Sequence, residues 1–144
     1  MLESWFDVLD IRCTRGIETE QTVYYRNKGN VGQGLQECFV MHGDMVLVQC
    51  RLDLEIPEGR REAVNDFALK YNATHPVVSL HMGEGADPGD SIYFQGLMPV
   101  SVLQARTRNS AAKERLNRIL DRVHRSALEI SPKIREIARG QTQE

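Results

Sequence analysis

The strongest hydrophobic pattern in the chain runs from Gln36 to Ile56. After His42-Gly43-Asp44, apolar and polar residues alternate. Because successive strand side chains point to opposite faces, this spacing predicts a strand with one buried and one mostly solvated face. The predicted buried face carries Val46, Val48, Cys50, Leu52, Leu54 and Ile56, and the other carries Met45, Leu47, Gln49, Arg51, Asp53 and Glu55. Since glycine and aspartate suit a tight turn, we predict two antiparallel strands joined at residues 42–44.

Other segments show helical or strand-like spacing. Four apolar residues near the N-terminus recur at intervals of three and four, which predicts an amphipathic helix that ends by about residues 14–16. They are Leu2, Trp5, Phe6 and Leu9. A second helix is predicted from about 57 to 71, with Asn72 as its stop and a solvated polar side that includes Arg60. Strands are predicted over 21–26, 77–82 and 91–98.

The last third of the chain carries a long helical repeat, predicted to span residues 110–138. Its apolar residues step by four and three through three heptads, which is typical of a helix that buries one seam along its length. The seam consists of Leu116, Leu120, Val123, Ala127, Ile130, Ile134 and Ile137. Pro132 lies inside it and predicts either a kink or a break, because proline removes a backbone donor and often begins a new helix.

Together these elements predict an α+β protein in which an antiparallel sheet of about five strands packs against helices. The predicted order is α-β-β-β-α-β-β-α with a long C-terminal helix, in a single domain that spans residues 1–144. The hairpin would place Cys38 and Cys50 on opposite sheet faces, so we expect reduced thiols. We see no secretory signal and no apolar run long enough to span a bilayer, and we expect a cytoplasmic protein with no membrane partner.

Charge is distributed unevenly along the chain. Residues 101–144 contain 10 Lys and Arg against 5 Asp and Glu, whereas residues 1–100 contain 8 against 15. A basic stripe opposite the helical seam is the feature that would favour a nucleic-acid partner. Acid-first i, i+4 pairs would neutralise much of this stripe and no aromatic residues interleave with it, so we favour a solvated helix face. The stripe is Arg115, Arg118, Arg122 and Arg125, and the pairs are Glu114–Arg118, Asp121–Arg125 and Glu129–Lys133.

No motif in the sequence predicts catalysis or a cofactor. The four histidines are scattered, and neither a nucleophile motif nor a metalloprotease motif is present. Loop 81–90 contains His81, Glu84, Asp87 and Asp90, which are candidate ligands for a divalent cation, but the spacing differs from an EF-hand and the composition is typical of a solvated turn. We therefore expect a non-enzymatic protein without cofactor or metal ion. Small-ligand or metal binding at loop 81–90 is an alternative.

The apolar strand MVLVQCRLDLEIP leads into EGRREAVNDFALKYN, and VVSLHMG is followed by SIYFQGLM and the C-terminal helix. In order and length, these segments resemble the YbjN-like family, whose fold is similar to that of type III secretion chaperones. The resemblance covers nearly the whole chain and implies a small, non-enzymatic α+β protein. It also implies a dimeric, protein-binding or chaperone-like module.

We expect a homodimeric module that binds a protein segment or a second copy of itself. Apolar residues on the second face of the hairpin would form one part of the binding surface, because exposed apolar patches mark partner sites. The alternative is that a helix of the same chain covers this face. The candidate partner-binding residues are Val40, Met45, Leu47, Leu120, Ala127 and Ile134. Nucleic-acid binding through the C-terminal helix is the less favoured function.

Overall fold

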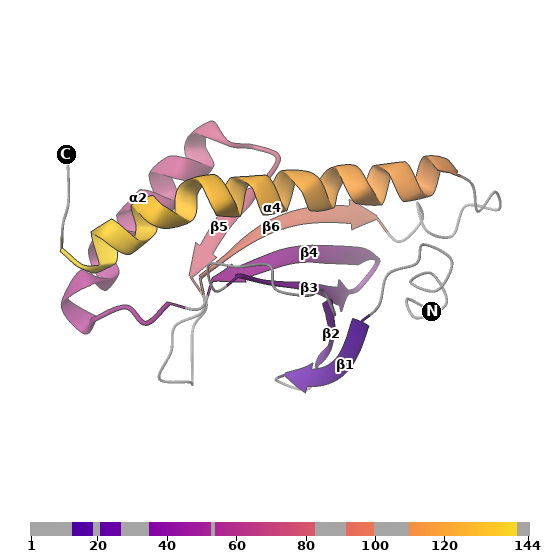
Figure 1. Ribbon diagram of the computed structural model, residues 1–144, viewed down its shortest axis with the longest axis horizontal. Helices are drawn as coiled ribbons and strands as arrows, with labels where there is room; N and C mark the ends of the chain where they lie inside the picture. The colour runs from indigo at the N-terminus through magenta and orange to yellow at the C-terminus, as the bar shows by residue number, and fades with distance from the viewer. Residues whose placement is uncertain are drawn as a thin grey trace.

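A computed structural model describes residues 13–18, 21–26, 35–52, 54–82, 92–99 and 110–140. Within these residues the chain has an α+β fold, in which a six-stranded antiparallel sheet packs against two helices (Figure 1). The elements are β1 (Cys13–Glu18), β2 (Gln21–Arg26), β3 (Leu35–His42), β4 (Met45–Leu52), the 3₁₀ helix η1 (Glu58–Arg60), α2 (Arg61–Thr74), β5 (Ser79–Met82), β6 (Ile92–Pro99) and α4 (Ser110–Ala138). The strand order is β1-β2-β3-β4-β6-β5.

The β3–β4 hairpin forms the centre of the sheet, as the alternation predicted. Its turn lies at Gly43 and Asp44, where Gly43 has a φ of 62°, a value that residues with a side chain rarely adopt. The predicted buried face is buried along the strand, at Val46, Val48, Cys50 and Leu52. On the opposite face Gln49 is also buried, at 6% exposure, although a solvated face was predicted. The strand itself ends at Leu52, four residues earlier than expected.

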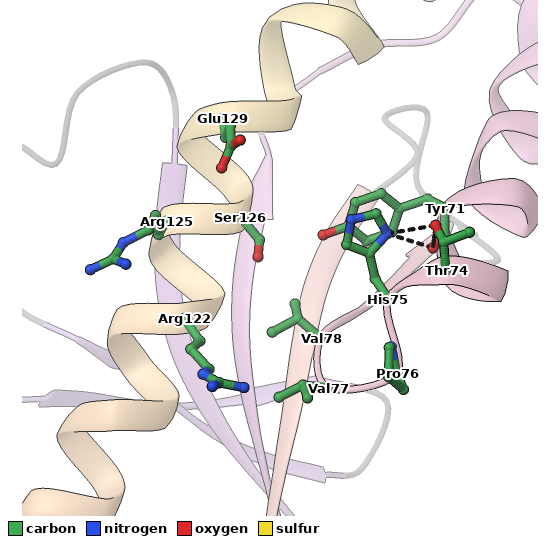
Figure 2. Close-up of a pocket in the computed structure, with 10 residues that line it drawn as sticks. All are labelled: Tyr71, Thr74, His75, Pro76, Val77, Val78, Arg122, Arg125, Ser126 and Glu129. Carbon is green, nitrogen blue, oxygen red and sulfur yellow. Dashed lines mark hydrogen bonds between the residues drawn. The ribbon is translucent and has the colours of Figure 1, made fainter.

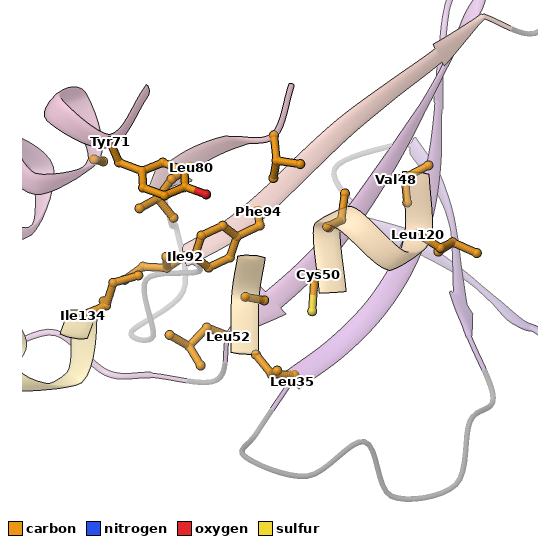
Figure 3. Packing of buried hydrophobic residues seen from close by; sticks show 14 of the residues in the cluster. Leu35, Val48, Cys50, Leu52, Tyr71, Leu80, Ile92, Phe94, Leu120 and Ile134 are labelled. Atoms are coloured by element: carbon orange, nitrogen blue, oxygen red, sulfur yellow. The ribbon is translucent and has the colours of Figure 1, made fainter. Parts of the chain in front are cut away.

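The main core lies between one face of the sheet and the two helices. Helix α4 runs along β4 and β6, while α2 lies against β5 (Figure 1). Figure 3 shows side chains of β5 and β6 meeting those of both helices in this layer. The predicted seam of α4 forms the helix side of the core: six of its seven residues are buried and Ile130 is partly buried. The seam therefore packs against the chain's own sheet.

Close approach of α4 to the sheet depends on Gly96, in the middle of β6. A Cβ atom at this position would lie 2.9 Å from Cγ2 of Ile119 and 3.0 Å from Cγ2 of Val123. Both distances are shorter than ordinary carbon–carbon contact, which is about 3.5–4.0 Å. The missing side chain of Gly96 therefore lets two branched residues of α4 pack directly on the backbone of β6.

Residues Cys13–Glu18 form an edge strand that the sequence did not predict. The expected N-terminal helix at Leu2, Trp5, Phe6 and Leu9 lies outside the described residues, but its expected end at 14–16 is wrong because these residues belong to β1. The register runs from Cys13 opposite Arg26 to Glu18 opposite Gln21. The described sheet therefore has six strands instead of about five. The segment has no clear alternation of apolar and polar residues, so its strand conformation depends on pairing with β2.

Helix α2 continues to Thr74 and does not stop at Asn72. The side-chain amide of Asn72 bonds to β5 instead: its Oδ1 accepts the Leu80 N–H at 2.7 Å, and its Nδ2 donates to the Leu80 carbonyl at 2.8 Å. Arg60 was expected on a solvated face, yet it is half-buried and donates from Nε to the Ile137 carbonyl at 2.9 Å. Asn72 therefore ties α2 to β5, the next strand in the sequence, and Arg60 ties η1 to the distant end of α4.

A kink or a break was predicted at Pro132, and of these two alternatives the break does not occur, because α4 runs through Pro132 as one helix. Ala127, five residues before the proline, and Ile134, two residues after it, are both fully buried. The packing on both sides of Pro132 outweighs the backbone hydrogen bond that proline removes. The single helix spans 29 residues, from Ser110 to Ala138, which matches the predicted range of 110–138.

The three cysteines are reduced thiols, as predicted. Cys38 lies opposite Gln49 in the hairpin and Cys50 lies opposite Glu37, so the two thiols point to opposite faces of the sheet. Both are fully buried, and Cys13 in β1 is partly exposed. Their placement on two faces excludes a disulfide between Cys38 and Cys50 without distortion of the sheet.

Candidate functional site

The sheet face directed away from α2 and α4, hereafter the outer face, carries an apolar row. Val40, Leu47 and Leu97 are direct partners across β3, β4 and β6, so their side chains lie side by side, and Met45 pairs with Pro99 next to them. Exposure rises along the row: Val40 is 3% exposed, Leu47 is partly buried and Leu97 is 53% exposed. The row therefore presents an uncharged apolar patch at its β6 end.

A chain of polar side chains adjoins this row and explains the burial of Gln49. Gln49 donates from Nε2 to Oε1 of Gln95 at 2.8 Å, and its own Oε1 accepts from Arg51 Nε at 3.1 Å and from Cys38 Sγ at 3.5 Å. A buried amide is stable only when its donors and acceptors are paired. These bonds give both the oxygen and the nitrogen of the Gln49 amide a partner within the outer face.

The β5 edge of the outer face contains a serine–histidine contact. Ser79 Oγ lies 2.7 Å from His81 Nε2 and 3.4 Å from the Gln95 carbonyl, and the His81 ring stacks on Tyr93 with a centroid distance of 5.3 Å. Burial lowers the pKa of His81. A nucleophile–base pair needs a third group that orients the base, and among the described residues no carboxylate pairs with His81. The contact is therefore better explained as packing along the edge strand.

The remaining histidines lie apart from this contact. His42 is exposed at the end of β3, and His75 follows the last turn of α2. His124 of α4 faces the core side of the sheet, where its Nδ1 lies 3.1 Å from Oε2 of Glu37, a carboxylate that is 3% exposed. The four histidines therefore occupy four separate environments, and no two of them converge on one site.

The candidate partner-binding residues divide between the two sides of the sheet. Val40, Met45 and Leu47 lie together on the outer face. The helical candidates lie on the core side, where they pack against the chain's own strands and are no more than 5% exposed: Leu120, Ala127 and Ile134. Leu97 was missed, although its position in β6 between Gly96 and the buried Met98 would have placed it on the outer face by alternation.

The basic stripe on α4 is exposed along its described length. Arg115, Arg118, Arg122 and Arg125 are all exposed. Of the three predicted acid–base pairs, only Asp121–Arg125 forms an ion pair among the described residues, with 2.7 Å between Oδ2 and Nη2. The stripe is therefore less neutralised than the spacing predicted.

A cleft of about 280 Å³ lies between α4 and the segment that joins α2 to β5 (Figure 2). One wall is the segment 75–78 together with Tyr71 and Thr74, and the other is formed by α4 residues Arg122, Arg125, Ser126 and Glu129. Val77 is 56% exposed at this cleft, whereas Val78 is buried in the core. The cleft thus combines an apolar wall with charged groups of both signs.

The orientation of the His75 ring is fixed at the end of α2. The ring stacks on Tyr71 with centroids 3.8 Å apart and an interplanar angle of 5°. Its Nδ1 lies 2.8 Å from the Tyr71 carbonyl and 2.9 Å from Thr74 Oγ1. Because a carbonyl only accepts, Nδ1 carries the proton and donates to it, which leaves Nε2 as an acceptor in the neutral ring.

The structure also bears on metal and membrane binding. Among the residues it describes, no group of three or more His, Cys, Asp or Glu side chains is placed to hold a metal ion. The loop acids Glu84, Asp87 and Asp90 fall outside the described ranges, so the alternative of a cation at loop 81–90 stays a prediction. None of the described helices combines the length and apolar character required to cross a bilayer.

Two solved structures are similar to this chain over most of its length. YbjN from E. coli, described as "a putative transcription regulator", has a TM-score of 0.67 at 12% identity over 92% of this chain and 89% of its own. An uncharacterised protein from Methanothermobacter thermautotrophicus has a TM-score of 0.55 at 17% identity over 94% and 95% of the two chains. No protein-family model and no curated protein matches the sequence. The chain therefore has a YbjN-like fold, as the resemblance of its segments implied.

Proposed function

We propose that the chain is a non-enzymatic regulatory module that binds protein, and that it forms a homodimer through its outer face. The supporting observation is that Leu97 of β6 is 53% exposed and lies beside Leu47 and Met45 of the neighbouring strand β4. Contiguous apolar surface of this kind marks interaction sites. The separation of the four histidines and the satisfied Gln49–Gln95 pair support a binding role in preference to catalysis.

A second copy of the chain fits this patch well. Val40, Met45, Leu47, Leu97 and Pro99 are all uncharged, so two copies can meet face to face without burying an unpaired charge. An isologous dimer uses the same patch on both subunits, and an uncharged apolar row is complementary to itself. The buried amide of Gln49, which adjoins the row, already has hydrogen-bond partners for its oxygen and its nitrogen, so burial at an interface would not leave this amide unpaired.

Light scattering after gel filtration tests this proposal. We expect the wild-type chain to be a dimer at micromolar concentration and Leu97→Lys to be a monomer with an unchanged circular dichroism spectrum. Leu69→Lys is the matched control, because Leu69 is 62% exposed on α2 and lies away from the outer face, so this variant should remain dimeric. A wild-type monomer, or a Leu97→Lys dimer, would contradict homodimerisation through this face.

Nucleic-acid binding through α4 is a second candidate function. The observation that favours it is that Arg115, Arg118 and Arg122 are exposed and form no ion pair among the described residues. Electrostatic binding to duplex DNA weakens with salt, with a log–log slope of about −0.9 per phosphate contacted. We expect Arg118→Glu to reduce this slope in fluorescence anisotropy titrations of a labelled duplex. Affinity for DNA and RNA that is absent, or independent of salt, would remove this candidate.

A further inference from the structure

We propose that the cleft between α4 and residues 75–78 binds an extended peptide in which an apolar residue lies between an acidic and a basic residue. This inference rests on the proposed function only in that the ligand is a protein segment. The cleft lies on the helical side of the sheet, so its occupancy is independent of the outer face. The charges, the apolar wall and the size of the cleft each define one part of the ligand.

The positive end of the cleft is Arg122. Its guanidinium forms no ion pair or hydrogen bond within the described part of the chain, and Figure 2 shows the side chain extending toward Val77. Arg125 is different, because Asp121 already neutralises it at 2.7 Å. A carboxylate of the ligand would pair with Arg122, since a planar guanidinium binds carboxylates with two parallel hydrogen bonds.

The negative end of the cleft is Glu129, which also has no ion pair among the described residues. Arg122 and Glu129 are two helical turns apart, which is about 10 Å along the axis at 1.5 Å per residue. An extended peptide covers about 10 Å in three residues, so an acid and a base three positions apart would match the two ends. The carboxylate of Glu129 would repel a phosphate backbone, which favours a peptide over a nucleic acid at this cleft.

The wall between the two charges is apolar. Val77 is 56% exposed and Pro76 is also exposed beside it, so an apolar side chain of the ligand would remove surface of both from water. A volume of about 280 Å³ lies at the lower limit of small-molecule sites, which hold about 300–1,000 Å³. The cleft therefore suits one large side chain of a peptide better than a cofactor.

The ring of His75 adds a hydrogen-bond acceptor to the same wall. Stacking on Tyr71 and donation from Nδ1 to the Tyr71 carbonyl fix its orientation before any ligand binds. Nε2 is then available to accept a hydrogen bond from a backbone N–H of the peptide. Preorganised groups of this kind raise affinity because less conformational freedom is lost on binding.

The test uses the full ¹⁵N-labelled chain and the capped peptide acetyl-Gly-Asp-Leu-Pro-Lys-Gly-amide. We expect amide shift changes concentrated in residues 75–78 and 122–129. Three comparison peptides replace the leucine by glycine, the lysine by aspartate, or the aspartate by lysine, and each should bind about fivefold more weakly, the equivalent of about 1 kcal/mol. Equal binding of all four peptides, shift changes elsewhere in the chain, or no binding of the first peptide would overturn the inference.

Charge-reversal variants provide the second part of the test. Arg122→Glu and Glu129→Lys should each weaken binding of the first peptide about fivefold, whereas the double variant should recover most of the affinity because the peptide can bind in the reverse direction. Arg122, Glu129 and the control position Arg118 are all exposed, so these substitutions should leave the fold intact. Arg118→Glu, one turn away and outside the cleft, is the control and should bind normally. A double variant as weak as the single variants would overturn the inference.

Leu97→Lys separates this inference from the proposed function. If both are correct, this variant is monomeric and still binds the peptide. If the wild-type chain is monomeric but binds the peptide, the peptide site is supported and the proposed homodimer is refuted. If the wild-type chain is dimeric but does not bind the peptide, the homodimer is supported and the peptide site is refuted.

Discussion

Substitution of Gly96 by alanine is the most direct test of how α4 packs on the sheet. The added Cβ would lie 2.9 Å from Ile119 Cγ2 and 3.0 Å from Val123 Cγ2, so α4 must move away or both side chains must change rotamer. Overpacking of this kind costs about 1–3 kcal/mol. Alanine also restricts the unfolded chain, which returns about 0.4–1 kcal/mol. We therefore expect Gly96→Ala to lower the free energy of unfolding by about 1–2 kcal/mol.

Urea and thermal unfolding, followed by circular dichroism at one protein concentration, measure this effect. A domain of this size loses about 4 °C of Tm per kcal/mol, so the expected decrease is about 4–8 °C. Gly59→Ala is the control, because a Cβ at Gly59 meets no atom within 4 Å, and its effect should stay within about 0.5 kcal/mol. In an Ile119→Ala background Gly96→Ala should cost less, because the shorter contact is gone. Unchanged stability of Gly96→Ala, or equal cost in both backgrounds, would refute the close approach of α4 to β6.

Three further predictions concern other contacts. Asn72→Ala should lower the free energy of unfolding by about 1–3 kcal/mol in urea titrations, since it leaves the N–H and carbonyl of Leu80 without their partner. Burial lowers the pKa of His81, so the unfolded chain binds more protons near its ordinary value of 6.5. The free energy of unfolding should therefore keep its full value above pH 6.5 and decrease as the pH falls below 6.5, which unfolding curves at several pH values can measure. Cys38 and Cys50 are fully buried, so a thiol reagent should modify them in the native protein far more slowly than the partly exposed thiol of β1.

Each of these predictions has a matched comparison within the chain. Asn65→Ala lies on the exposed face of α2 and should leave stability nearly unchanged. His81→Phe keeps a ring against Tyr93 and should reduce the dependence of stability on pH; an identical pH dependence would assign it to another group. In urea all three thiols should react at similar rates, and equal rates in the native state would contradict the burial of the two hairpin cysteines.

The sequence predicted the buried face of an element correctly where the apolar pattern of that element matches the side that packs in the core. Alternation in the β3–β4 hairpin predicted the buried face of β4, and the four-three spacing after position 110 predicted the side of α4 that meets the sheet. The fold class and the order of most elements followed from these two patterns. Ends of elements were less accurate: Asn72 was predicted to stop α2, but its amide bonds to Leu80 of β5 and the helix continues to Thr74.

The candidate sites depend on contacts that no local pattern contains. The cleft joins residues 75–78 to 122–129, segments that are distant in the sequence, and neither segment has an unusual composition. Gln49 was predicted to be solvated because only its own strand was considered, yet Gln95 of β6 supplies the partner that makes its burial possible. The i, i+4 spacing of charged residues also predicted ion pairs on α4 poorly, because exposed pairs of this kind contribute only about 0.2–0.5 kcal/mol and need not form.

The strand order has a consequence for the newly made chain. β6 lies between β4 and β5, although β5 precedes it in the sequence. One side of β4 therefore stays unpaired until residues 92–99 have left the ribosome and all eight register pairs, from Met45–Pro99 to Leu52–Ile92, can form. An open strand edge with apolar side chains is a template for pairing with other chains. Nascent or truncated chains that end before Ile92 should therefore aggregate, a hazard that disappears once β6 closes the gap.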